Sequence, residues 1–200
     1  MAETETETIL VSADAARRFG TDVLVHGGLS PENARIVADA LVLADLRGVD
    51  SHGLNRLSGY LARIKSGALD PSPELPFVQR SPVCALLDAQ HTLGFLAAHA
   101  AVERALEIAA SFGVGVVAVK NSGHYGMAAT YLLQAIDRGY GAMAFTNASR
   151  SMPAWGSREP LLGTSPFAVG LPGGSKGHFI LDMSPAVVAR VRIHSTHMSK

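Results

Sequence analysis

Residues 114–126 read Val-Gly-Val-Val-Ala-Val-Lys-Asn-Ser-Gly-His-Tyr-Gly. The apolar run 114–119 predicts a buried strand, and the amphipathic segment 127–138 that follows predicts a helix. The polar turn between them places His124 between two glycines at the carboxyl end of a strand, where a rigid element can hold it beside a cleft. From this segment alone, the simpler interpretation is an ordinary β–α turn with an incidental histidine. Other stretches of the sequence have to decide between the two interpretations.

The composition limits the class of protein. The chain has 200 residues, of which 48% are hydrophobic and 17% charged, which is enough apolar material for a sizeable core. Its 17 basic and 17 acidic residues give no net charge, and no basic stripe is present, which argues against nucleic-acid binding. The single cysteine, Cys84, excludes an internal disulfide framework and fits a reducing compartment.

No segment has the pattern of a secretory leader or a membrane span. Residues 1–8 are acidic and threonine-rich, unlike the basic and then apolar start of a leader, and we expect a disordered tail there. No run of about 18 apolar residues occurs, so no membrane contact is expected. These observations predict a cytoplasmic protein.

Residues 9–76 are expected to form a helical N-terminal region. Helical spacing predicts helices over 13–26 and 31–46, each after a serine suited to an N-cap, and the second has proline at its first position. A third helix is expected over 54–65, and the proline-rich segment 68–76 is typical of a linker.

A polar, glycine-bracketed loop, residues 47–53, joins the second and third helices. It contains Ser51 and His52, and His52 is expected at the start of the third helix, beside free backbone N–H groups. Arg56 and Tyr60 are four residues apart and share one helix face. These side chains suit a small carboxylate, since a guanidinium can bind both carboxylate oxygens. Alternatively, the aspartate or serine of this loop caps the helix and the arginine is merely solvated.

Residues 77–190 are expected to form an α/β region. A long alanine-rich segment with apolar residues at helical spacing predicts a helix over 92–112, and residues 150–160 are expected to be irregular. Residues 186–190 are expected to begin a further helix. Apolar and β-branched segments predict further strands at 77–88, 142–145, 167–171 and 178–182. The expected fold class is therefore α/β, with a helical N-terminal region followed by a mixed sheet with helices.

The usual nucleotide and metal motifs are missing from the sequence. No G-x-G-x-x-G lies between a strand and a helix, and no phosphate-binding G-x-x-x-x-G-K occurs. The pair Gly173-Gly174 lies between two expected strands and is discounted as a phosphate loop. There is no H-E-x-x-H and no cysteine pair, so no metal site is expected.

Five motifs, in the same order, resemble those of the type-2 malate/L-lactate dehydrogenase family, which includes ureidoglycolate and sulfolactate dehydrogenases and cyclic imino-acid reductases. Residues 44–53 with Arg56 resemble its ADLRGxDSHGxxR signature, and the hexapeptide around His124 resembles NSxHxG. The other three are residues 146–149, similar to TNxS, residues 155–166, similar to WGGREPLLGTNP, and residues 181–184, similar to LDMS/A.

The resemblance implies a mixed α/β fold that binds NAD or NADP without the usual Rossmann fold, and a homodimer with active sites near the subunit interface. It implies reversible hydride transfer between the nicotinamide and the α-carbon of a small 2-hydroxy or 2-imino acid. The residue that matches the acid/base position is His124, and a histidine titrates near the operating pH. The matching substrate-binding positions are Ser51, His52, Arg56 and Tyr60. The positions that match cofactor contacts are Asn147, Ala148, Ser149, Gly163, Thr164, Asp182, Met183 and Ser184.

The end of the chain departs from the family pattern. The family continues with VVARGK and many further residues, whereas Val191 and Arg192 stand here in place of the glycine and the lysine, and residues 191–200 form an atypical tail. We therefore expect the cofactor-binding region, 77–190, to be incomplete. Two hypotheses stay open: an NAD(P)-dependent 2-hydroxy acid dehydrogenase, or a related imino-acid reductase, and a catalytically inactive truncated remnant of such an enzyme.

Overall fold

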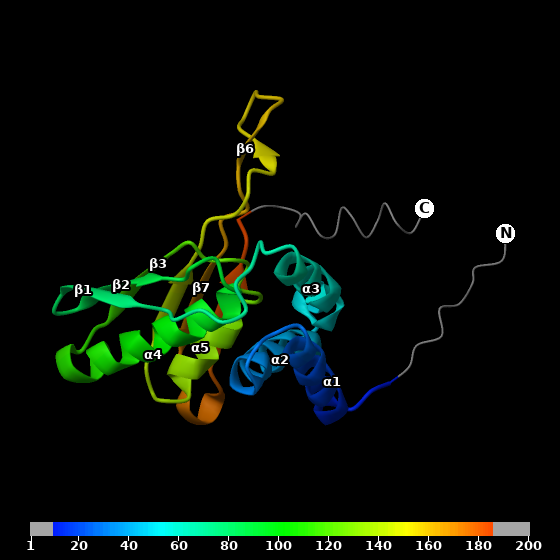
Figure 1. Cartoon of the computed structure of the whole chain (residues 1–200). Coiled ribbons are helices and arrows are strands. Elements are labelled where there is room, and N and C mark those ends of the chain that lie inside the picture. Colours follow the sequence, from blue (N-terminus) through cyan, green and yellow to red (C-terminus); the bar gives the residue numbers. More distant parts are fainter. Residues whose placement is uncertain (1–9, 186–200) are drawn as a thin grey trace.

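The computed structural model describes residues 10–185 of the chain (Figure 1). The expected tail over 1–8, the helix expected to begin at 186 and the atypical tail over 191–200 lie outside the described residues. No helix within the described part is long and apolar enough to cross a membrane.

Three helices form the N-terminal part of the structure: α1 (Ala13–His26), α2 (Pro31–Leu46) and α3 (Leu57–Lys65). The first two begin as predicted, because the hydroxyls of Ser12 and Ser30 each accept a backbone N–H three residues later, both at 3.2 Å. Their apolar faces form one core together with the first turn of α4. The predicted third helix begins later than expected, since residues Leu54–Arg56 form a 3₁₀ turn before α3.

The first sheet has the order β1-β2-β3, with strands Phe77–Ser81, Cys84–Asp88 and Val116–Lys120. The prediction of one strand over 77–88 is wrong, because the chain turns at Pro82 and β1 pairs antiparallel with β2. Proline has no N–H to donate to a ladder, which explains the turn. Helix α4 (Gly94–Phe112) connects β2 to its parallel neighbour β3 and packs on both strands.

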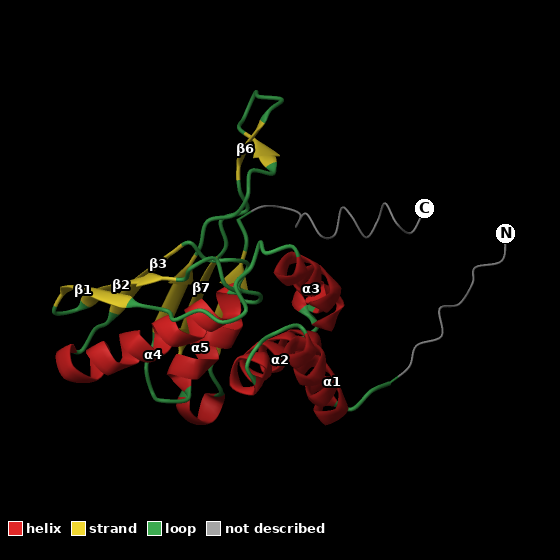
Figure 2. Ribbon diagram, in the orientation of Figure 1, coloured by secondary structure: helices red, strands yellow, loops and turns green. Residues whose placement is uncertain are grey.

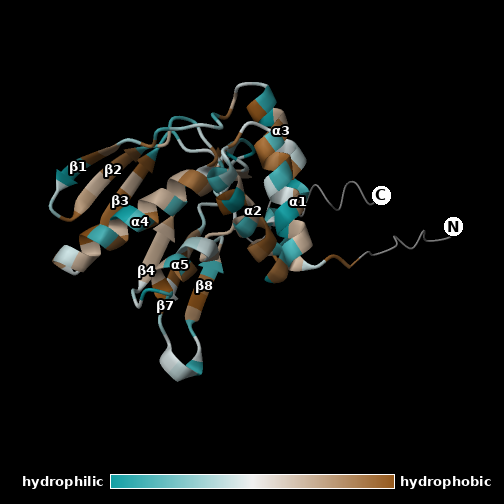
Figure 3. Cartoon of the chain, turned by 60° about the horizontal axis from the view of Figure 1, so that its bottom comes forward, coloured by the Kyte–Doolittle hydropathy of each residue, from teal (hydrophilic) through white to brown (hydrophobic). Residues whose placement is uncertain are grey.

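The second sheet has the order β4-β7-β8, with strands Ala142–Phe145, Phe167–Leu171 and Phe179–Met183, all antiparallel. One face carries the small residues Ala142, Ala144, Ala168 and Gly170, and helix α5 (Ala129–Ile136) packs on it. The other face carries larger apolar residues that stay exposed, because side chains alternate along each strand. Figure 2 shows the helices and strands of this α/β arrangement, and Figure 3 shows how apolar the strands are.

A two-stranded arm projects from the second sheet and is labelled at β6 in Figure 1. Its strands are β5 (Met152–Pro153) and β6 (Pro160–Leu162), which pair antiparallel. Residues 150–160 are therefore not wholly irregular as predicted. The sequence signal was weak, because three residues at most form each strand and prolines interrupt both.

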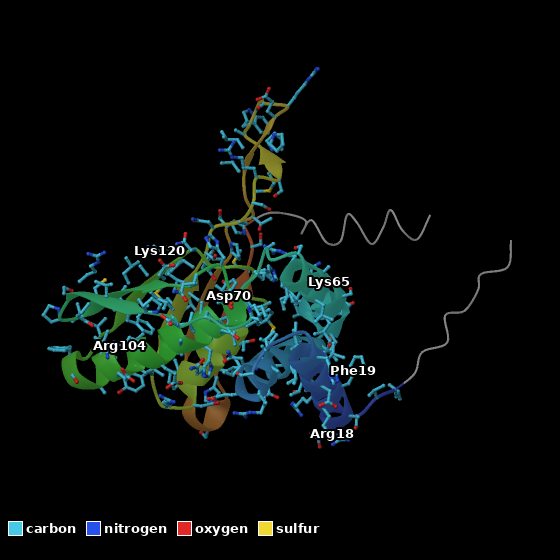
Figure 4. All side chains as sticks on the ribbon, viewed as in Figure 1. Arg18, Phe19, Lys65, Asp70, Arg104 and Lys120 are labelled. Carbon is cyan, nitrogen blue, oxygen red and sulfur yellow. The ribbon has the colours of Figure 1, made fainter. Side chains whose placement is uncertain are left out.

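The α/β class predicted from the sequence is confirmed. The described strands form two three-stranded sheets, each with one helix on one face, and the two-stranded arm. The segment after α3 leads from the helical part to the first sheet and passes through Asp70, which is labelled together with Lys65 in Figure 4. The Thr92 hydroxyl donates to the Asp70 carbonyl oxygen at 2.6 Å, which fixes that segment against the start of α4.

Candidate active site

The loop that carries His124 is fixed to the start of α4. The N–H of Gly94 donates to the His124 carbonyl oxygen at 3.0 Å, and the N–H of Gly123 donates to the Thr92 carbonyl oxygen at 2.9 Å. A Cβ atom on Gly94 would overlap the Gly123 carbonyl oxygen. Both glycines are therefore required by close backbone approach, and they explain why the predicted turn is rigid.

The loop before α3 is fixed by Asp45 of α2, a residue that sequence analysis missed. One Asp45 carboxylate oxygen accepts the Leu54 N–H at 2.9 Å, and Gly53 leaves the space that this carboxylate fills. The alternative interpretation, in which the aspartate or serine of the loop caps the third helix, is wrong, because no side chain caps the start of α3. The Ser51 side chain instead lies 2.9 Å from Nδ1 of its neighbour His52.

Four of the predicted substrate and acid/base residues have side chains that meet at one place. The Tyr60 hydroxyl is hydrogen-bonded to Nδ1 of His124 at 2.8 Å, although 64 positions separate the two residues. The His52 ring stacks on the His124 ring with centroids 5.4 Å apart. The side chains of Ser51, His52, His124 and Tyr60 are thus connected in that order, each in contact with the next.

Phe95 completes the wall of this cluster and was also missed by sequence analysis. Its ring meets Tyr60 edge-on at 5.5 Å and His124 edge-on at 6.5 Å. Phe95 itself is 1% exposed, so it forms a fixed surface against which both rings rest. Nε2 of His124 makes no hydrogen bond to a residue within 10–185, and the ring keeps an exposed side.

The surroundings of His124 keep its ring neutral. Crowding by protein atoms, together with the positive charges of His52, Arg56 and Arg63, lowers the pKa of His124 to about 4. One side of the ring is open to solvent, so the lowering of its pKa comes from the sides that protein atoms cover and from the nearby positive charges. Burial and the Arg56 charge also lower the pKa of His52, against the opposing effect of Asp182.

Arg56 is half-buried beside this cluster. Burial raises the pKa of Tyr60, and the nearby Arg56 guanidinium opposes that rise. Arg56 forms no ion pair with an acidic residue in the part of the chain that the structure describes. A guanidinium that hydrogen-bonds Tyr60, has no acidic partner among the described residues and lies next to a neutral histidine is a suitable place for a carboxylate.

The predicted cofactor-contact segments meet at one end of the second sheet. The N–H of Thr146 donates to the Pro166 carbonyl oxygen at 3.3 Å, and the Ser184 hydroxyl donates to the Thr164 carbonyl oxygen at 3.1 Å. Gly163 lies so close to Ala148 that a Cβ atom would overlap the Ala148 carbonyl oxygen. The structure thus brings together the predicted positions 147–149, 163–164 and 182–184.

Several side chains at this sheet end are open to solvent. Asn147, Ser149 and Met183 are exposed, and Thr164 is half-buried. Amide and hydroxyl groups on exposed strand ends fit the sugar and phosphate oxygens of a dinucleotide. The residues present therefore fit part of a nicotinamide cofactor site.

Asp182 connects the sheet end to the His124 cluster. One of its carboxylate oxygens accepts the Ala129 N–H, at the start of α5, at 2.7 Å. Burial of Tyr125, together with the Asp182 charge, raises the pKa of Tyr125 to about 12. The same charge opposes the lowering of the pKa of His52. The residue predicted as a cofactor contact thus also has a structural contact that the sequence did not indicate.

Two features of the described residues limit the kind of site. No group of three or more histidine, cysteine or acidic residues within 10–185 is arranged to hold a metal ion. A shallow hollow of about 420 Å³ is lined by Val23, His26 and Leu61, on α1 and α3, and includes no predicted site residue. The candidate site is therefore an open cluster around His124.

Comparison with known proteins decides the family. The family model described as malate/L-lactate dehydrogenase matches residues 11–200. The chain belongs to this family. A malate/L-lactate dehydrogenase family relative, the malate dehydrogenase of Pyrococcus abyssi, is 38% identical over 180 residues, which are 90% of this chain and 49% of the relative.

Other members agree in sequence and fold. The L-sulfolactate dehydrogenase of Methanocaldococcus jannaschii is 36% identical over 185 residues, 92% of this chain and 54% of that protein. The crystal structure of malate dehydrogenase from Entamoeba histolytica matches with a TM-score of 0.92 and 34% identity, over 97% of this chain and 54% of that one. The chain spans about half the length of the malate/L-lactate dehydrogenase family relatives that it matches.

Proposed function

We propose that this chain binds the substrate and transfers the proton in an NAD(P)-dependent 2-hydroxy acid dehydrogenase. The observation that carries the proposal is the hydrogen bond between the Tyr60 hydroxyl and Nδ1 of His124 at 2.8 Å, with Nε2 left for a ligand. The family membership and the five motifs support it. The substrate is a small 2-hydroxy acid or the corresponding 2-oxo acid, and a cyclic imino acid is the alternative.

His124 takes the hydroxyl proton in the oxidation direction. For that step Nε2 needs a free lone pair, so the ring proton must be on Nδ1, where the Tyr60 oxygen accepts it. This tautomer gives up the 3.3 Å contact in which the Gly126 N–H donates to Nδ1. A phenol oxygen can accept or donate, so Tyr60 keeps its contact in either tautomer of the ring. In the reverse direction, the doubly protonated ring donates from Nε2 to the carbonyl oxygen of the 2-oxo acid.

Arg56 holds the carboxylate in this proposal. A guanidinium binds both carboxylate oxygens, which orients the α-carbon and its hydroxyl relative to His124. The bound negative charge also offsets the arginine charge that lowers the pKa of His124. Binding of the acid therefore raises the pKa of His124 toward neutrality, where the ring is a better proton acceptor.

Asn147, Ser149 and Thr164, with the neighbouring backbone, would hold part of the nicotinamide cofactor, either NAD or NADP. Bound there, the oxidised nicotinamide would supply the acceptor for the hydride of the α-carbon, and the reduced form would supply the hydride for the reverse reaction. Asp182 orders the start of α5 next to this cofactor region and balances charge near His52. A homodimeric assembly and a cytoplasmic location stay predictions from the sequence.

The proposal is tested by following the absorbance of reduced nicotinamide. The purified chain is mixed with NAD or NADP and a panel of 2-hydroxy acids, and with the reduced cofactors and the matching 2-oxo acids. We expect an absorbance change with at least one acid. If the folded chain neither turns over nor binds any acid of the panel, the proposal is wrong. Binding without turnover would favour the alternative of a catalytically inactive remnant.

A further inference from the structure

Arg63 lies on the face of α3 that carries the substrate-binding residues. Positions 56, 60 and 63 follow the helical spacing of four and then three residues, so their side chains share one stripe. Tyr60 is the middle member of this stripe, and its hydroxyl contacts His124. Arg63 is therefore one turn beyond the residue that positions the proton carrier, on the same side of the helix.

The direction of helical side chains favours contact with the same ligand. In an α-helix the Cα–Cβ bond tilts toward the N-terminus, so the Arg63 side chain leans back toward Tyr60 and the start of α3. Arg56 and Arg63 are seven residues apart, which corresponds to about 10 Å along the axis of an α-helix. Because both arginine side chains are long, their guanidinium groups can approach to the distance between the two acidic groups of a small diacid.

Arg63 is available for an anion. Its side chain is exposed, and no ion pair joins it to an acidic residue within the described range 10–185. Its positive charge lowers the pKa of both His124 and Tyr60, which places the charge near the cluster. Two guanidinium groups on one stripe next to His124 thus lack acidic partners among residues 10–185.

We propose that Arg63 binds a second acidic group of the substrate and selects 2-hydroxy diacids over 2-hydroxy monoacids. The inference rests on the proposed function, in which Arg56 takes the carboxylate next to the reacting carbon. Arg63 then takes the carboxylate or sulfonate at the far end of the same molecule. Its role is to bind and orient the substrate, and no proton passes through it.

The test compares malate and lactate, which differ by one carboxylate. Dissociation constants of the whole chain for each acid, as both enantiomers, are measured by calorimetric titration with and without NADH. Three variants are titrated at constant ionic strength: Arg63→Gln, Arg63→Lys and Lys65→Gln. Lys65 is a matched control, because it is a charge on the same helix two residues away, on the opposite side.

We expect Arg63→Gln to weaken malate binding about 10-fold and to leave lactate binding unchanged, the size typical of an exposed charged hydrogen bond. Arg63→Lys should restore part of the malate affinity, and Lys65→Gln should change neither acid. Equal weakening of both acids, or no change in their ratio, would overturn the role of Arg63 while the proposed function stands. If the unaltered chain binds neither malate nor lactate but binds another acid of the panel, this inference fails while the proposed function stands. If it binds no acid of the panel, both fail.

Discussion

His124 is the residue on which the proposed chemistry depends. Replacing it with alanine removes the proton acceptor but leaves the Gly94 and Gly123 backbone contacts that hold the loop. In any preparation that turns over, His124→Ala should lower kcat by about 10²–10⁴-fold, the usual contribution of general acid–base catalysis. The measurement is the initial rate at saturating acid, with the unfolding curve as a check on folding. Unchanged kcat would exclude His124 as the proton carrier.

The titration of His124 gives a second prediction for a single residue. Packing and the charges of His52 and Arg56 hold its pKa at about 4 in the folded chain, against 6.5 for an ordinary histidine. Since the folded state takes up this proton less readily than the unfolded state, the stabilising effect is complete above pH 6.5 and is lost as the pH falls toward 4.

The NMR signals of the ring carbons report this titration directly. Arg56→Gln should raise the midpoint of His124, because a neighbouring positive charge is removed, whereas Lys65→Gln should leave it in place. A bound 2-hydroxy acid should also raise it, as its carboxylate offsets Arg56. A midpoint near 6.5 in the free chain would contradict the described surroundings of the ring.

Among the elements, β8 and α5 are joined by Asp182. Its carboxylate accepts the Ala129 N–H, so Asp182→Ala should lower the free energy of unfolding by about 1 kcal/mol, as for other lost helix caps. Asp182→Asn keeps an oxygen acceptor without the charge. This second variant should retain most of the stability but lower the pKa of His52 further, because Asp182 raises it.

Denaturant unfolding and the His52 ring signals separate these two effects. An equal loss of stability in both variants would contradict this prediction. It would mean that the charge of Asp182, and not its hydrogen bond, stabilises the start of α5.

The start of α4 and the His124 loop approach so closely that Gly94 cannot carry a side chain. Gly94→Ala should destabilise the fold by roughly 1–3 kcal/mol, as overpacking does, and should displace the His124 loop. Gly59 of α3 is the matched control, because a Cβ atom there meets nothing within 4 Å. Gly59→Ala should stabilise by about 0.5–1 kcal/mol, the helix propensity difference. Both values come from denaturant unfolding, and equal effects would show that the close approach is not limiting.

The sequence predicted those elements whose signals lie within a few neighbouring residues. Serine caps and apolar spacing predicted α1 and α2, and the 3.6-residue period placed Arg56 and Tyr60 on one face. The same period extends to Arg63, so the sequence already indicated that Arg63 shares this face. Pro82 was likewise visible as the end of a strand, but its effect on the segment 77–88 was missed.

Contacts between distant segments could not be predicted from spacing. Nothing in the sequence around Tyr60 indicates that its hydroxyl meets a histidine 64 residues later, or that Asp182 reaches α5. Those contacts depend on how the two sheets and the N-terminal helices pack. The motif resemblance could group Tyr60, His124 and Asp182 because the motifs of one family belong to one fold.

At the scale of the whole molecule, the feature with the largest consequence is the face of the second sheet that no helix within residues 10–185 covers. Opposite α5, the strands expose large apolar side chains. They are Met143 (63%), Phe145 (67%), Leu171 (50%), Phe179 (56%), Leu181 (36%) and Met183 (39%). A contiguous apolar patch on a sheet promotes association, because burying it removes apolar area from water.

The chain should therefore associate as its concentration rises, and the double variant Phe145→Lys with Phe179→Lys should oppose this. Both side chains are more than half exposed, so the change should cost little stability. Phe112→Lys is the control, because Phe112 is also exposed but lies at the end of α4, away from this face. Sedimentation velocity over a concentration series, with unfolding curves, measures both properties. Equal suppression by the control would show that added charge, and not this face, governs association.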